Sequence, residues 1–109
     1  MPNKRPNLLF IFTDEQRADT MAGYGNTFVH APSLNALGRE SFVFEHAYVT
    51  QPVCTPSRAS IMTGLYPHTC GCTQNNIPLR ASTQTLAEML PADYQCGYYG
   101  KWHLGDEIR

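Results

Sequence analysis

The stretch Cys54-Thr55-Pro56-Ser57-Arg58-Ala59-Ser60-Ile61-Met62-Thr63-Gly64 places a thiol, a proline, a helix-capping serine and an arginine within five residues. We expect a helix that begins near Ser57, because serine and proline are common at helix starts. The unpaired backbone N–H groups and the positive dipole end of that helix would point back toward Cys54, and Arg58 would add a fixed charge. The stretch therefore predicts an anion-binding site beside Cys54, although a lone cysteine is more often a buried structural thiol.

Length and charge limit the classes of protein to consider. A chain of 109 residues with 42% hydrophobic content is large enough for one small domain. The net charge is −1, so no basic surface argues for nucleic acid or an anionic membrane as a partner. The apolar run Leu8–Phe12 is too short for a signal-peptide core or a membrane span. We expect a soluble protein and favour the cytoplasm, with an upstream leader left open.

Hydrophobic patterns predict alternating strands and helices, hence an α/β chain. Strands are expected in three stretches, namely 7–13, 42–49 and 94–100. One helix is expected from Pro32, with an apolar face made by Leu34, Leu37 and Phe42. A second helix is expected after a cap at Ser82 or Thr83. Between them, residues 66–82 are predicted to form a long polar loop.

Two acidic side chains follow the first predicted strand directly. Asp14 and Glu15 would lie at the carboxyl edge of a parallel sheet, where ligands of α/β proteins gather. Their oxygen atoms suit a hard cation such as calcium, magnesium or manganese. The competing interpretation is a solvated charged turn.

A lysine and a histidine follow the last predicted strand. If the strand's alternation continues, Lys101 and His103 face one side and Trp102 faces the other. That side would carry an ammonium and an imidazole together. A Lys-x-His pair taken alone is more often ordinary surface.

Taken together, these motifs resemble the sulfatase family. The resemblance is carried by Cys54-x-Pro56-Ser57-Arg58 with its extension through His68, by Gly100-Lys101-Trp102-His103-Leu104-Gly105, and by the acidic pair at 14–15. It implies an alkaline-phosphatase-like α/β sandwich, with a mostly parallel sheet flanked by helices. It also implies that residues 1–109 are the N-terminal fragment of a sulfatase catalytic domain.

The resemblance implies hydrolysis of a small-molecule or carbohydrate sulfate ester. A maturation enzyme would oxidise Cys54 to formylglycine, whose hydrate attacks sulfur through one hydroxyl and expels sulfate through the other. Arg58 would hold the hydrate, Lys101 would contact the sulfate, and His103 would act as the base in the second step.

The resemblance also implies a site for a divalent metal, with Ca²⁺ as the expected ion and Mg²⁺ or Mn²⁺ as alternatives. Its ligands would include Asp14 and the converted Cys54. Glu15 departs from the family's more frequent second aspartate, which leaves its role as a ligand open. Further metal ligands and sulfate-binding residues of the family are expected beyond Arg109, so we expect this chain alone to have little or no activity.

Three other interpretations stay open. The first is a phosphonate or phosphate ester hydrolase of the same superfamily, and the second is a non-catalytic anion-binding domain. The third is a cysteine-based metal or redox module built on Cys70, Cys72 and Cys96.

Overall fold

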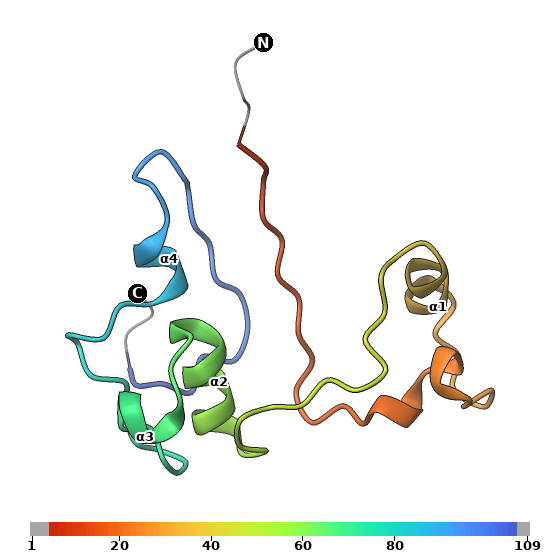
Figure 1. The fold of residues 1–109 in the computed structure, drawn as a ribbon, viewed down its shortest axis with the longest axis horizontal. Helices are drawn as coiled ribbons and strands as arrows, with labels where there is room; N and C mark the ends of the chain where they lie inside the picture. Colours follow the sequence, from red (N-terminus) through yellow and green to blue (C-terminus); the bar gives the residue numbers. More distant parts are fainter. Residues whose placement is uncertain (1–4, 107–109) are drawn as a thin grey trace. The chain divides into compact units, whose positions relative to one another are not determined.

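The computed structural model describes residues 5–106. Over this range the chain forms short helices joined by long irregular segments (Figure 1). The elements, in chain order, are the 3₁₀ turns η1 (Ala18–Thr20) and η2 (Ala22–Tyr24) and the helices α1 (Pro32–Arg39), α2 (Cys54–Thr63), α3 (Pro67–Cys70) and α4 (Leu86–Met89). None of the helices in this range is long and apolar enough to cross a membrane.

The chain divides into two compact units. The first extends to His46 and the second begins at Ala47. In the first unit, α1 begins at Pro32 as predicted, because proline has a φ suited to the first helical turn and no N–H that needs a partner there. Phe42, expected on the apolar face of this helix, lies beyond its end. The Tyr24 hydroxyl donates to the Phe44 carbonyl over 3.0 Å and ties η2 to the segment after α1.

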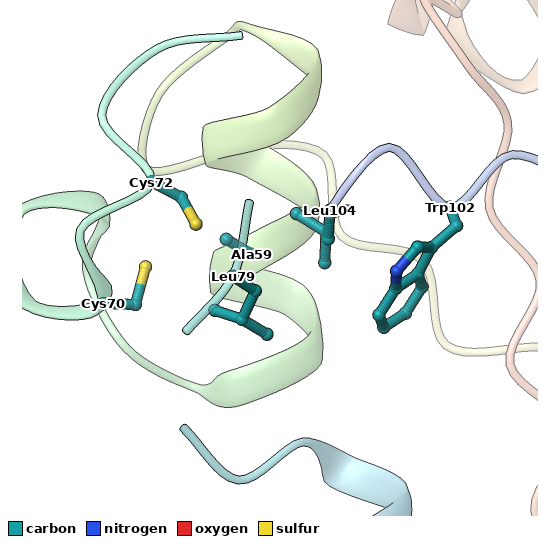
Figure 2. Close-up of a cluster of buried hydrophobic side chains, with 6 residues drawn as sticks. All are labelled: Ala59, Cys70, Cys72, Leu79, Trp102 and Leu104. Carbon is teal, nitrogen blue, oxygen red and sulfur yellow. The ribbon is translucent and has the colours of Figure 1, made fainter. Parts of the chain in front are cut away.

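The second unit contains the buried core. α2 packs against α3, and six side chains from α2, α3 and the following segments are buried together (Figure 2): Ala59, Cys70, Cys72, Leu79, Trp102 and Leu104. A backbone hydrogen bond of 2.8 Å from the Leu79 N–H to the Leu104 carbonyl joins two of these segments. The segment around Leu104 is therefore packed against α2 by apolar burial and joined to the segment around Leu79 by backbone pairing.

The three strands predicted from the sequence are not found in the described residues. Residues 5–106 contain no strand, and the stretches 7–13, 42–49 and 94–100 are irregular. Apolar patterning favours a strand only where a neighbouring strand accepts its backbone hydrogen bonds and covers its faces. The first run is not covered in this way, since Leu9 is 86% exposed. The mostly parallel sheet expected from the sequence is thus not present in the part of the chain that the structure describes.

Helix boundaries also differ from the sequence-based expectation. α2 begins at Cys54, three residues before the predicted start at Ser57. α4 is capped at Thr85, not at Ser82 or Thr83: the Glu88 carboxylate accepts the Thr85 N–H at 2.7 Å and the Thr85 hydroxyl at 2.8 Å. The predicted polar loop includes the single turn of α3, which ends at Gly71 in the left-handed conformation.

Candidate active site

Cys54 and Arg58 lie on the same face of α2 because they are four residues apart on a helix. Pro56 is tolerated in the first turn, where N–H groups have no partner within the helix. The Thr55 N–H, one of these, donates to the Asn75 side-chain oxygen over 3.0 Å. A loop residue far along the chain therefore performs the capping that the sequence suggested for Ser57, whose own N–H donates to the Val53 carbonyl.

Lys101 meets Cys54 across 47 positions of sequence. Its Nζ lies 3.5 Å from the Cys54 sulfur, within the range of a hydrogen bond to sulfur. The carbonyl of Lys101 accepts hydrogen bonds from the Arg58 guanidinium and, over 2.6 Å, from the Tyr98 hydroxyl. The guanidinium is also within 3.5 Å of that hydroxyl. The side chains of Arg58 and Tyr98 thus fix the backbone from which the lysine reaches the thiol.

The backbone of His103 is held against the first turn of α2. The Thr55 hydroxyl, fully buried, donates to the His103 carbonyl over 2.9 Å. On the imidazole, Nε2 lies 3.0 Å from Oδ1 of Asn76. Nδ1 is buried and has no hydrogen-bond partner within residues 5–106.

Burial alternates along this segment although it is not a strand. Trp102 and Leu104 are buried in the core, whereas Lys101 is exposed and His103 is half-buried. The pattern predicted that Lys101 and His103 face away from Trp102, and the burial of these three side chains differs in that sense. His103 achieves this difference with a φ of 57°, in the left-handed region, and not by regular strand geometry.

The charges around Cys54 suit an anion. Lys101 brings a cation to the N-terminal end of α2, where the helix dipole adds partial positive charge, and the Arg58 guanidinium one turn further along donates to the carbonyl of the same lysine. Arg58 is 5% exposed, so its charge acts in surroundings that screen it less than water does. A group at position 54 that carries negative charge on its oxygen atoms would therefore be stabilised by these positive charges.

The acidic pair belongs to the first unit. Asp14 and Glu15 precede η1, and Glu15 has a positive φ of 52°. Over the described range, no three or more His, Cys, Asp or Glu side chains are grouped to hold a metal ion. Two carboxylates fall short of the six to eight oxygen ligands that calcium takes. The described residues thus do not complete a metal site, and the convergence of Asp14 and Glu15 with Cys54 stays a prediction.

Cys70 and Cys72 belong to the core and not to a three-thiol metal site. Both are buried, while Cys96 is exposed, and no metal-binding group of three forms in the described chain. Burial raises the pKa of Cys72 to about 11, with a further rise from the neighbouring Cys70 thiol and an opposing effect of Arg80. Buried thiols packed against Ala59 and Leu79 act as small apolar groups.

Four residues that position the site were not singled out from the sequence: Thr55, Asn75, Asn76 and Tyr98. Thr55 lies inside the motif but fills its variable position. Asn75 and Asn76 stand in a stretch that indicates only a loop, and Tyr98 looks like part of a strand. The partners of Thr55, Asn75 and Asn76 are 20 to 48 residues away, so no local pattern could have identified these residues. Tyr98 donates to Lys101 only three residues on, but its second partner, Arg58, is 40 residues away.

Comparison with known proteins identifies the family to which this chain belongs. The sulfatase family model matches residues 6–106. The chain belongs to the sulfatase family, and the resemblance inferred from the motifs is confirmed. Sulfatases generally use a divalent metal and a formylglycine made from the motif cysteine, and their fold is the alkaline-phosphatase-like α/β fold.

Named relatives agree with this membership. The chain is 41% identical over 106 residues to an ulvan-active sulfatase of Formosa agariphila, covering 96% of this chain and 21% of that protein. It is 35% identical over 105 residues to an N-acetylglucosamine-6-O-sulfatase of Bacteroides thetaiotaomicron, covering 95% and 19%. It is 37% identical over 109 residues to arylsulfatase A of Bos taurus, covering 92% and 21%. The chain thus spans about a fifth of the length of these relatives. The comparison with solved structures found no significant match to this chain.

Proposed function

We propose that the protein carrying this sequence hydrolyses sulfate esters through a formylglycine made from Cys54. One observation carries the proposal: the Lys101 ammonium lies 3.5 Å from the Cys54 sulfur, on the helix end that also presents Arg58. Family membership supports the reaction class. Two relatives are named an ulvan-active sulfatase and an N-acetylglucosamine-6-O-sulfatase. These names support a sulfated carbohydrate as the substrate class.

The hydrated aldehyde at position 54 would supply a hydroxyl nucleophile and a second hydroxyl whose deprotonation lets sulfate leave. Lys101 would bind the sulfate oxygens and offset the charge that develops on them. Arg58 would hold the hydrate and keep the Lys101 backbone in place through its carbonyl. His103 would take the proton of the second hydroxyl.

We further propose that a divalent cation, with calcium preferred, completes the site with Asp14, residue 54 and, less directly, Glu15. The choice of metal is supported by the carboxylate oxygens of Asp14 and Glu15 alone, because hard oxygen ligands suit calcium or magnesium better than zinc. Ligands beyond those described here are required to fill the coordination shell.

Mass spectrometry of the Cys54 peptide tests the modification. The chain is co-expressed with a formylglycine-generating enzyme, and the thiol-to-aldehyde conversion is read as a mass change that Cys54→Ser abolishes and Cys96→Ser leaves intact. An unconverted Cys54 in the presence of active maturation enzyme would favour the non-catalytic anion-binding domain.

Matched substrates test the reaction. The protein that carries this sequence is assayed on aryl sulfate and aryl phosphate esters that share one leaving group. Faster turnover of the sulfate is expected, and a clear preference for the phosphate would replace the proposal by a phosphate ester hydrolase. In either case Lys101→Ala should lower turnover by about 10²- to 10³-fold, as loss of one charge-stabilising donor does.

A further inference from the structure

Among the described residues, the ring of His103 is hydrogen-bonded to the side chain of Asn76. The Asn76 Oδ1 lies 3.0 Å from Nε2, and an amide oxygen accepts hydrogen bonds but does not donate them. Nε2 must therefore carry a proton for this contact to be a hydrogen bond. A neutral imidazole carries one N–H, so the lone pair then lies on Nδ1, the nitrogen without a partner in the described chain.

The same loop residue is tied to His103 through the backbone. The Asn76 N–H donates to the Thr55 hydroxyl over 3.4 Å, and that hydroxyl donates to the His103 carbonyl over 2.9 Å. Thr55 thus bridges the backbones of residues 76 and 103. The contact between amide and imidazole is a second link between segments that are already joined.

Backbone conformation singles out the two partners. Asn76 has a φ of 66° and His103 a φ of 57°, and with Glu15 they are the non-glycine residues of positive φ in the described range. Such a conformation is strained for a residue with a side chain, less so for asparagine. Strain of this kind persists where surrounding contacts hold it, and it is concentrated at functional sites.

We propose that Asn76 is a positioning residue, which holds His103 as the Nε2–H tautomer and leaves Nδ1 as the ring atom that accepts a proton. The functional meaning rests on the proposed function, in which His103 is the base. The tautomer itself does not depend on that function. An Asn76 amide turned the other way would donate its NH₂ to Nε2 and impose the opposite tautomer.

Long-range ¹⁵N–¹H NMR of the histidine rings in the full chain tests this assignment without any activity assay. His30, His46 and His68 are all exposed and provide internal references. We expect His103 to show a protonated Nε2, an unprotonated Nδ1 and an observable Nε2 proton. A wild-type His103 protonated on Nδ1 overturns the proposal, and this spectrum decides it even if a variant fails to fold.

Two variants of Asn76 separate positioning from mere folding. Asn76→Gly keeps a residue that tolerates positive φ and removes the acceptor, so the Nε2 proton should exchange roughly five- to tenfold faster. Asn76→Asp keeps an acceptor and should retain the wild-type tautomer and slow exchange. Asn75→Ala, which alters the capping of Thr55 but not the imidazole contact, is the matched control. An unchanged Nε2 exchange rate in Asn76→Gly would overturn the proposal.

If these spectra come out as expected while the parent protein fails to hydrolyse sulfate esters, the proposed function is wrong and the assignment of the tautomer stands. If sulfate hydrolysis is found with the opposite tautomer, the function stands and Asn76 does not act as proposed. The two hypotheses therefore fail separately.

Discussion

Replacing Thr55 by valine should destabilise the second unit, because Thr55 joins α2 to two distant segments. Its hydroxyl donates to the His103 carbonyl over 2.9 Å and accepts the Asn76 N–H over 3.4 Å, and the residue is fully buried. Valine has nearly the same shape but cannot make either bond.

The magnitude follows from what is left unpaired. A buried carbonyl without its donor costs about 1–3 kcal/mol. The longer second bond adds less, and the extra buried methyl group returns up to about 0.8 kcal/mol. We expect a net loss of about 2 kcal/mol. With a urea m-value of about 1 kcal/mol/M for a unit of this size, the unfolding midpoint should fall by about 2 M.

The chain contains a built-in probe for this measurement. Trp102 is its single tryptophan and lies in the core of the second unit, so its fluorescence during urea unfolding reports on that unit. Thr55→Ser keeps the hydroxyl and loses only a methyl group, and it should cost about 1 kcal/mol. Thr73→Val, at an exposed threonine, should change the midpoint little. A midpoint for Thr55→Val equal to or above that of Thr55→Ser would refute the reasoning.

Three further predictions use the same fluorescence assay. Tyr98→Phe removes the hydroxyl that donates to the Lys101 carbonyl and should cost about 1 kcal/mol, whereas Tyr99→Phe, at a residue 96% exposed, should cost nothing measurable; equal effects would contradict the assigned bond. Gly71→Ala should cost about 1–2 kcal/mol, because φ is 89° and the added Cβ would lie 3.0 Å from the Arg80 guanidinium, and Gly71→Asn should cost less since asparagine tolerates this φ better. Burial raises the pKa of Cys72 from an ordinary value of 9.0 to about 11, so the unfolded chain loses this proton at a lower pH than the folded chain. The free energy of unfolding should therefore fall as pH rises from about 9 to about 11, and Cys72→Ala should flatten that fall. A free energy of unfolding that rises over this range would contradict the shift.

The candidate site residues could be proposed from the sequence because their types and spacing are local. Cys54 and Arg58 are four positions apart, close enough for the sequence to place both at the start of one helix. That they share a helix face follows from the observed start of α2 at Cys54, three residues before the predicted one. Family membership was likewise recognisable from short motifs, and the family model that matches residues 6–106 confirms it.

The strands could not be predicted reliably because a strand is not a local structure. The runs 7–13, 42–49 and 94–100 have suitable composition, yet each needs a partner segment for its backbone groups. Leu9, Phe42 and Tyr99 are largely exposed, so the faces that the pattern marks as buried are not covered in the described chain. Composition indicates the capacity to pair but cannot supply the neighbour.

By itself the sequence determined the family to which the chain belongs and pointed to Cys54 and the charged residues near it as candidates, because these depend on residue identity and short spacing. Only the tertiary structure decided that Lys101 reaches the Cys54 sulfur, that Asn75 caps α2 and that Asn76 holds the His103 ring. Those contacts join segments 20 to 47 residues apart. They form because Trp102 and Leu104 are buried in the core with Ala59 of α2, which draws the last segment of the chain against that helix.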